Sequence, residues 1–434
     1  MTKLTSSGVE PRTVRSGASR RLSPGLRIAL VGVVAAIGLA GCGSTTSSSA
    51  STSATPSAIA SSAAIPSATP ALSPTAAPPL SFVATGSMHT ARERATATLL
   101  KNGKVLIAGG EAQNGLPWTV YASAELYDPA TGKFTNTGSM AAARGKATAI
   151  ALSDGRVLIA GGEGCKNPKA CRNIDGETIG DLASAEIYDP ATGKFTTTGS
   201  MTDVTRNSAA ALLPDGKVLI VGQVNSWGQL YDPATGKFVR TGEVGNFDVP
   251  FTATLLPSGK VLVTGHGAAP QLYDEASGKF TDISLELPAG TPKVAYDSQW
   301  VLRRGAPDTA TLLKDGRVRL FDSVYLETYD PATGVCADAG FISPAGKWEQ
   351  PTATLLADGS VLYEGGRVVG SDGNSTNTNV AILYDPTGGS SRKGSTQVAR
   401  EYQTATLLQD GSGLIAGGEE ANSKALASAE LFKP

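Results

Sequence analysis

The chain has 434 residues, a formal net charge of -1, 51 glycines and only 17% charged residues. One ordinary compact domain does not reach this length, so a repeat or barrel architecture is expected. The near-zero charge excludes a broad basic surface for nucleic acid, and four cysteines are too few for a scaffold built on disulfides.

The N-terminus reads as a secretion signal over residues 1-41. Basic residues precede an uncharged apolar run from Ile28 to Ala40, which is too short to span a bilayer as a helix of ~20 residues. The run ends in Leu39-Ala40-Gly41-Cys42, which resembles the bacterial lipobox. That resemblance implies that Cys42 is lipidated and anchors the protein to the extracytoplasmic face of the bacterial cell membrane. The alternative is an ordinary signal peptide with an incidental cysteine.

Residues 42-80 follow as a linker made almost wholly of Ser, Thr, Ala and Pro. Such a segment cannot bury enough apolar surface to offset its chain entropy. We expect a disordered tether that lifts the folded part off the membrane.

From residue 81 the chain repeats one unit. The turn glycine of this unit recurs seven times, at Gly103, Gly155, Gly216, Gly259, Gly316, Gly359 and Gly411. A period of about 50 residues is in the range of propeller blades.

Each unit predicts four strands. The first copy has Ala95 to Leu100, then Asn102-Gly103, then Lys104 to Ile107. An Asn-Gly or Asp-Gly pair tolerates the positive φ of a tight hairpin, so the first two strands are expected to be antiparallel. Ala-Glu-Leu-Tyr forms the third strand. Asp-Pro-Ala-Thr-Gly-Lys then turns the chain, and the fourth strand starts at a phenylalanine such as Phe134.

The repeated order of a paired glycine, Glu-x-Tyr-Asp-Pro and an aromatic residue resembles the Kelch repeat family over residues 81-434. The resemblance implies an all-β fold, a seven-bladed β-propeller of four-stranded antiparallel blades like the central domain of galactose oxidase. Phenylalanine replaces the usual fourth-strand tryptophan, and copies three to five lack the paired glycine. The fifth copy, which includes Arg317 to Asp322, is the least regular and is expected to be the most distorted.

The two ends of this region complete each other. The last copy stops after its third strand at Pro434, whereas Leu80 to Met88 match a fourth strand that has no preceding three. We expect Phe82-Val83 to pair with Glu430-Leu431, which removes the open edges of a linear array. A closed ring of this kind is expected to be a monomer.

The loops predict where a partner binds. In a four-stranded antiparallel blade the short repeated turns share one face, and the second-to-third loops and inter-blade connections share the other. Variable loops on a rigid scaffold concentrate function. All tryptophans and histidines of the chain map to this variable face: Trp118, Trp227, Trp300, Trp348, His89 and His266. The alternative is that long loops pack their own aromatic residues onto the blades.

Charged residues repeat on the same face. Arginines precede the first strands at Arg92, Arg94, Arg144, Arg206 and Arg400, and glutamates follow second strands at Glu111, Glu163 and Glu419. One interpretation is that Arg–Glu pairs join neighbouring blades. The other is an anionic ligand held by a ring of arginines.

The cysteines and histidines suggest little further chemistry. Cys165 and Cys171 lie in one loop and are expected to form a disulfide in an oxidising compartment, whereas Cys336 has no evident partner. No metal site is expected, because His89 and His266 lack a recognisable ligand spacing. No cofactor is predicted either.

Some Kelch-type propellers are galactose oxidase-like copper enzymes or sialic acid mutarotases. The copper-radical site needs two histidines and a cysteine linked to tyrosine. It is not expected here, since His89 and His266 fall in non-adjacent blades and Cys336 falls on the opposite face. A mutarotase-like activity needs only a few polar groups at the channel mouth. We favour a cell-envelope module that binds a protein or glycan, with small-carbohydrate catalysis as the alternative.

Overall fold

A computed structural model describes residues 79–113, 118–165, 171–172, 179–223, 227–245, 249–266, 269–283, 307–343 and 346–434. The regular secondary structure of these residues is β-strand, with no α-helix among them. The predicted signal, Cys42, nearly all of the linker and Trp300 lie outside the described residues. Within the described part, no helix meets the length and hydropathy needed to cross a membrane.

The described residues form seven four-stranded antiparallel sheets, called sheets 1 to 7 in chain order. Sheet 1 contains β2 (Thr96–Leu99), β3 (Val105–Ala108), β6 (Ala124–Asp128) and β7 (Lys133–Asn136). Sheet 2 contains β8 (Thr148–Ala151), β9 (Val157–Ala160), β13 (Ala185–Asp189) and β14 (Lys194–Thr197). Sheet 3 contains β15 (Ala209–Leu212), β16 (Val218–Val221), β17 (Trp227–Asp232) and β18 (Lys237–Glu243).

The remaining sheets follow the same plan. Sheet 4 contains β19 (Val249–Leu255), β20 (Val261–His266), β21 (Gln271–Asp274) and β22 (Lys279–Asp282). Sheet 5 contains β23 (Thr309–Leu312), β24 (Val318–Asp322), β25 (Tyr325–Asp330) and β26 (Val335–Phe341). Sheet 6 contains β28 (Thr352–Leu355), β29 (Val361–Glu364), β32 (Val380–Asp385) and β33 (Ser390–Ser395). Sheet 7 contains β34 (Thr404–Leu407), β35 (Gly413–Ala416), β38 (Ala429–Lys433) and β1 (Ser81–Ala84).

Shorter strands extend the second-to-third loops and one connection between sheets. They are β4 (Glu111–Ala112), β5 (Thr119–Val120), β10 (Glu163–Gly164), β11 (Cys171–Arg172), β12 (Gly180–Asp181), β27 (Lys347–Glu349), β30 (Arg367–Val369), β31 (Ser375–Asn377), β36 (Glu419–Glu420) and β37 (Lys424–Ala425).

The hairpins follow from the turn residues. In sheet 1, Leu99 pairs with Val105 across the Asn102-Gly103 turn, and Gly103 has a φ of 82°. A residue with a side chain is strained at such an angle, whereas glycine is not. The predicted strand order within each unit is therefore the observed one.

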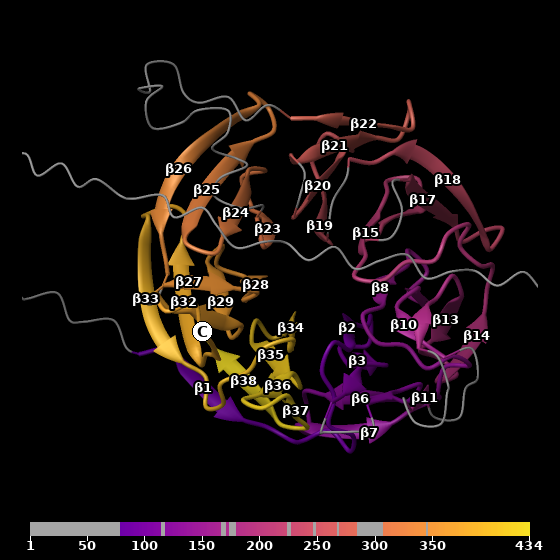
Figure 1. The fold of residues 1–434 in the computed structure, drawn as a ribbon, viewed down its shortest axis with the longest axis horizontal. Coiled ribbons are helices and arrows are strands. Elements are labelled where there is room, and N and C mark those ends of the chain that lie inside the picture. Colours follow the sequence, from indigo (N-terminus) through magenta and orange to yellow (C-terminus); the bar gives the residue numbers. More distant parts are fainter. Residues whose placement is uncertain are drawn as a thin grey trace, which may run out of the picture. The chain divides into compact units, whose positions relative to one another are not determined.

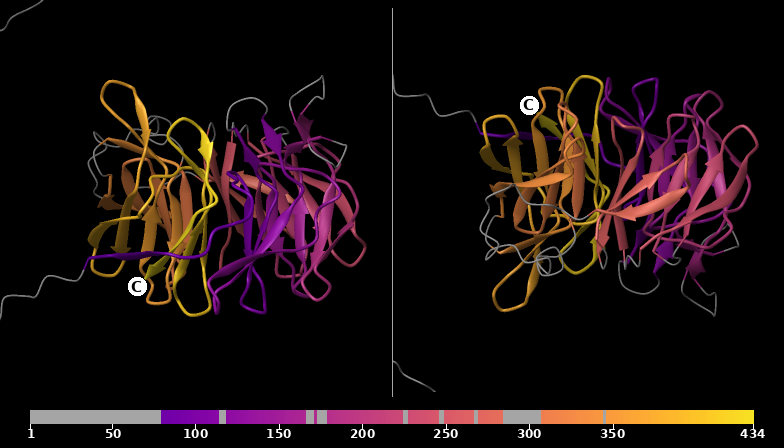
Figure 2. Two further views of the ribbon diagram at one scale, coloured as in Figure 1. Left: turned by 90° about the horizontal axis from the view of Figure 1, so that it is seen from below. Right: turned by 90° about the horizontal axis from the view of Figure 1, so that it is seen from above.

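Figure 1 shows the seven sheets arranged around a common centre, and Figure 2 shows their strands running between two faces. The first strands lie innermost. Each contacts the first strand of the sheet before and after it, in the order β2, β8, β15, β19, β23, β28 and β34, and β34 also contacts β2. The all-β fold is therefore propeller-like, with one face of each sheet packed on its neighbour.

The two ends of the described chain share sheet 7. β1 pairs antiparallel with β38, so that Phe82 lies opposite Phe432 and Val83 lies opposite Leu431. The Phe82 and Phe432 rings are 5.3 Å apart between centroids.

The core lies between neighbouring sheets and is built from the apolar second strands. Val105, Leu106 and Ile107 are all at most 1% exposed, and burying each such side chain contributes about 1.5–3 kcal/mol. A tyrosine of the third strand also reaches the preceding sheet. Its hydroxyl lies 2.8–2.9 Å from a threonine hydroxyl in the pairs Tyr127–Thr85, Tyr188–Thr137, Tyr231–Thr198 and Tyr273–Thr241.

The fifth copy does not stand apart in its backbone. Sheet 5 has all four strands and one register shift, between Tyr325 and Glu327. Sheets 3 and 4 each contain a shift of the same kind. The expectation that sheet 5 is the most distorted is therefore not met, because its irregular sequence changes side chains more than strand pairing.

Candidate functional site

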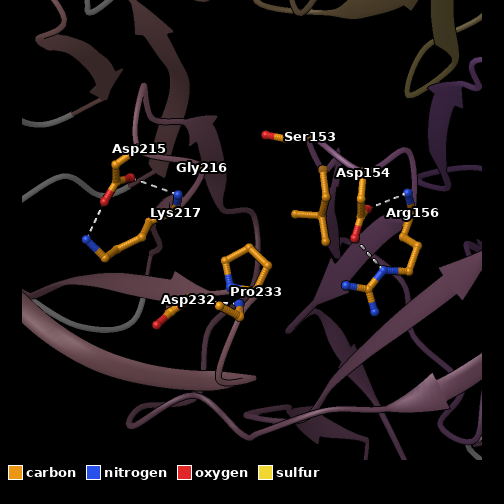
Figure 3. Close-up of a pocket in the computed structure, with 10 residues that line it drawn as sticks. Ser153, Asp154, Arg156, Asp215, Gly216, Lys217, Asp232 and Pro233 are labelled. Carbon is orange, nitrogen blue, oxygen red and sulfur yellow. Dashed lines mark hydrogen bonds and ion pairs between the residues drawn. The ribbon is translucent and has the colours of Figure 1, made fainter.

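The short repeated turns share one end of the molecule, here called the short-turn face. A hollow of about 380 Å³ is bordered there by the first turn of sheet 2 at Asp154 and by both turns of sheet 3, at Asp215 and Asp232. Figure 3 shows that its charged groups face their own turns: Asp154 bonds Arg156, and Asp215 bonds Lys217. A second hollow of about 290 Å³ lies in the equivalent place one sheet earlier. Both are shallow features of a repeated surface.

The opposite end carries the second-to-third loops and the connections between sheets, and is called the variable face. Each connection before sheets 1, 2 and 7 holds a buried arginine. In the connection before sheet 2, Arg144 Nη1 donates to the carbonyl oxygens of Gly161 at 2.9 Å and Ser184 at 3.0 Å. Its Nη2 donates to Glu186 Oε1 at 2.8 Å. Glu186 also accepts the backbone N–H of Ala141 and of Ala142.

The same arrangement recurs at Arg92 with Glu125 and at Arg400 with Glu430. All three arginines are at most 1% exposed. Burial lowers the pKa of Arg92 and of Arg144, and the paired glutamate opposes that effect. These arginines therefore join neighbouring sheets and cannot meet a partner, which corrects their assignment as binding residues. Their carboxylates also come from the third strands, whereas the sequence pointed to Glu111, Glu163 and Glu419.

Arg206 is a different case. It lies one residue later in its repeat, and Thr205 occupies the arginine position. In sheet 3 a glutamine, Gln229, replaces the glutamate and accepts the N–H of Thr202. The side chain of Arg206 is 38% exposed and pairs with Asp181 at 2.9 Å. Arg206 is therefore on the surface, unlike Arg92, Arg144 and Arg400.

Four residues, of which only Arg94 was among the predicted arginines, form an arc around the centre of the variable face. Tyr402, Arg94, Lys146 and Asn207 occupy the same position in successive connections, and all have positive φ, between 46° and 55°. Their backbones are hydrogen-bonded in series: Arg94 N donates to Tyr402 O, Lys146 N to Arg94 O and Asn207 N to Lys146 O. We call these four residues the rim arc. Non-glycine residues held at positive φ are costly and cluster at functional sites.

Carboxyl groups line the rim arc. Backbone bridges join Glu93 to Glu111 and Glu401 to Glu419. Arg94 Nη1 lies 2.8 Å from Glu111 Oε1, and Lys146 pairs with Glu163. Sequence reasoning found Glu111, Glu163 and Glu419, but it missed Glu93 and Glu401, which lie on the connections between sheets.

Two of these carboxyl groups hold protons unusually tightly. Burial, with the adjacent Glu419 carboxyl, raises the pKa of Glu93 to about 9. Burial also raises the pKa of Glu401 to about 7, where Glu419 adds to the effect and Arg367 opposes it. A neutral carboxyl group can donate a hydrogen bond or a proton near neutral pH. The arc therefore combines proton donors with the cations Arg94 and Lys146.

The aromatic residues of the variable face differ in exposure. Arg94 lies over Tyr402, Lys146 Nζ is 5.4 Å from the centroid of Trp118, and Arg240 is 5.9 Å from that of Trp227. Trp118 is half-buried, and Trp227 is 39% exposed.

Trp348 cannot bind a partner as the structure stands, which corrects its prediction. It is 0% exposed, and its indole N–H donates to Gly365 O at 2.6 Å. It lies in β27, which pairs with β30 and holds the ring against Phe321. The predicted alternative, that loop aromatics pack onto the sheets, applies to this residue.

The two histidines lie in different parts of the chain, His89 in the connection before sheet 1 and His266 in sheet 4. His89 Nδ1 lies 3.0 Å from Glu125 Oε2, and its side chain is 55% exposed. His266 ends β20, and its side chain is not among those described. Within the described residues, no group of three His, Cys, Asp or Glu side chains is arranged to hold a metal ion.

The cysteines occupy two settings. Cys165 and Cys171 are joined by a disulfide with their Cα atoms 5.3 Å apart. Cys336 is buried, and burial together with Glu327 raises the pKa of its thiol.

Comparison with known proteins supports the fold alone. No protein-family profile and no curated sequence matches the chain. A solved structure described as a fungal alcohol oxidase of the AA5 family in complex with copper is similar, with a TM-score of 0.54 and 16% identity over 82% of this chain and 76% of that one. The structure of YjhT is also similar, with a TM-score of 0.46 and 14% identity over 80% of this chain and 96% of that one. The chain thus has a β-propeller-like all-β fold.

Proposed function

We propose that the seven sheets are the blades of one closed Kelch-type β-propeller. The pairing of β1 with β38 supports closure, as does the contact of β34 with β2. Further links between the last and first sheets run from Gln409 Nε2 to Lys101 O and from Arg94 N to Tyr402 O. The repeated Gly-Gly and Glu-x-Tyr-Asp-Pro residues support the Kelch assignment.

This propeller is a lipid-anchored module of the bacterial cell envelope. The residues that support this proposal are the basic and apolar N-terminal segments and the Leu39-Ala40-Gly41-Cys42 sequence. Because the linker ends where β1 begins, the tether would join the propeller at sheet 7.

The module binds a protein or glycan of the envelope through the variable face. The single observation that carries this proposal is the rim arc, in which four connections hold Tyr402, Arg94, Lys146 and Asn207 at positive φ. Trp227 and Arg240 extend the same face outward with an exposed aromatic ring and a cation. Tryptophan, tyrosine and arginine are the residues most enriched at binding hot spots.

A small-carbohydrate enzyme, mutarotase-like in mechanism, is the second candidate. The observation that favours it is Glu401, which lies 3.9 Å from Arg367 and whose pKa is raised to about 7 by burial and the adjacent Glu419. Perturbed carboxyl groups beside cations are typical of acid–base sites.

The first test is capture of proteins and glycans from envelope extracts by the full chain, by Trp227→Ala with Arg240→Ala, and by a control, Lys217→Ala, on the short-turn face. We expect the first variant to lose the captured species and the control to retain them. Loss in the control alone would place the partner on the short-turn face and contradict the proposal.

The second test separates the enzyme from the binding module. Interconversion of sugar anomers is followed by NMR with the full chain and with Glu401→Gln. Catalysis that Glu401→Gln abolishes would favour the enzyme. Capture without any catalysis would favour the binding module.

A further inference from the structure

Sheet 5 departs from the other six sheets at one buried position. The second residue of the second strand is leucine in six copies: Leu106, Leu158, Leu219, Leu262, Leu362 and Leu414. These side chains face the next sheet, since Leu106 packs in one cluster with Val157 and Ile159 of sheet 2. In β24 this residue is Arg319. Its guanidinium therefore enters an interface that is apolar elsewhere.

Three other residues with polar groups lie with Arg319 at the interface between sheets 5 and 6. Thr328 is its cross-strand partner in β25, where the six other copies have leucine or isoleucine, and cross-strand partners point to the same face. Tyr363 of sheet 6 replaces a residue that is aliphatic in every other copy. The Tyr384 ring lies 4.7 Å from the Arg319 guanidinium carbon.

Arg319 differs from the other buried arginines in its charge balance. Arg92, Arg144 and Arg400 each have a glutamate oxygen within 3.0 Å. Arg319 is 2% exposed, yet its Nε and Nη1 have no hydrogen-bond partner among the described residues, and the Tyr363 hydroxyl has none either. No described carboxylate lies within ion-pair distance of it. A buried cation without a counter-charge destabilises the folded state.

We propose that Arg319, Thr328 and Tyr363 form a buried binding site for a small inorganic anion of the halide class between sheets 5 and 6. Two guanidinium N–H groups and a phenol hydroxyl can all donate to one anion. A water molecule would accept these hydrogen bonds but would leave the charge uncompensated. Because Arg319 and Tyr363 are almost completely buried between two packed sheets, we expect the anion to be small.

The decisive experiment is anomalous diffraction from crystals of the full chain grown with bromide in place of chloride. We expect a bromide peak within hydrogen-bond distance of Arg319 Nε or Nη1 and of the Tyr363 hydroxyl. Density for water alone at this position, with no anomalous signal, would overturn the proposal.

Thermal unfolding provides a second measurement. At constant ionic strength, replacing a bulky organic anion by chloride should raise the Tm of the full chain, because an ion that binds only the folded state stabilises it. Arg319→Leu, which restores the residue of the other copies, should remove this rise. Tyr363→Phe, which deletes only a hydroxyl, should reduce it. An equal rise in all three proteins would contradict the site.

Discussion

The guanidinium of Arg94 lies 3.7 Å from the centroid of the Tyr402 ring, and Arg94 N donates to Tyr402 O at 3.0 Å. The two residues come from the connections that precede the first and the last sheet. Arg94 also pairs with Glu111, and Glu93 beside it meets Glu419. The seam between sheets 7 and 1 therefore combines a cation, an aromatic ring and several carboxyl groups, so its stability depends on protonation.

The first prediction concerns Glu93→Gln. The pKa of Glu93 is about 9 in the folded chain and about 4.3 in an unfolded one. The folded state thus binds the proton more tightly, and the free energy of unfolding falls as the pH rises between these values. Glutamine cannot ionise, so the variant should be more stable than the parent at pH 8, by roughly 1–5 kcal/mol from the difference between the two pKa values, and no more stable at pH 4. Denaturant unfolding across this pH range measures it.

The matched control is Glu420→Gln. Glu420 lies in the same short strand as Glu419, but its side chain is 35% exposed and pairs with Lys424 on the surface. We expect its unfolding curves to follow the parent at every pH. A pH dependence that persists unchanged in Glu93→Gln would show that another group is responsible.

The second prediction concerns the buried Arg144–Glu186 pair. Removing one partner leaves an unpaired buried charge, so Arg144→Met should lower the free energy of unfolding by ~3–5 kcal/mol. The control, Arg156→Met, breaks a surface ion pair with Asp154 and should cost less than ~1 kcal/mol. Urea unfolding compares them, and equal losses would contradict the structural role of Arg144.

In sheet 3 the equivalent contact is made by neutral residues, and this leads to the third prediction. It has Thr205 and Gln229 where sheet 2 has Arg144 and Glu186. The double variant Arg144→Thr with Glu186→Gln should therefore lose less stability than Arg144→Thr alone. A larger loss of stability in the double variant than in Arg144→Thr would mean that the buried Glu186 carboxylate is not stabilised by Arg144.

The strands were predictable because their signals are local. Asn102-Gly103 and Pro129 determine turns within a few residues, and the strands lie between these turns. The burial of Arg144 was not predictable in the same way. Arg144 lies in the connection before sheet 2, and its partner Glu186 lies far along the chain in β13. Both interpretations of the Arg–Glu pattern fit the same residues.

Two other features left no clear mark in the sequence. Arg94 and Lys146 have positive φ although neither is glycine or asparagine, so residue type alone does not reveal the rim arc. Trp348 occupies the position of Arg92, Arg144 and Arg400 in its repeat, and its indole N–H donates to Gly365 O as those arginines donate to Gly109, Gly161 and Gly417. Its strand β27 pairs with β30 and covers the ring, a tertiary arrangement that a loop assignment does not contain.

The fourth prediction concerns the link between sheets 1 and 2. The Tyr188 hydroxyl lies 2.9 Å from Thr137 Oγ1, and one such hydrogen bond contributes about 1 kcal/mol. Tyr188→Phe and Thr137→Val should each lower the free energy of unfolding by this amount. The double variant should lose less than their sum, because both remove one bond. Additive losses in a double-mutant cycle would show that the hydroxyls do not interact.

The last prediction compares the stability of variants at two tryptophans, both of which were predicted to bind a partner. Trp348 is fully buried and bonded to Gly365 O, so Trp348→Ala should lower the free energy of unfolding by ~3–5 kcal/mol. Trp227 is 39% exposed, so Trp227→Ala should change it by less than ~1 kcal/mol. Fluorescence gives a second measurement, since acrylamide reaches an exposed indole. Loss of Trp227 should remove quenchable emission, whereas loss of Trp348 in a chain that still folds should remove shielded emission. If Trp348→Ala proves as stable as the parent, its ring is not part of the core and remains available to a partner.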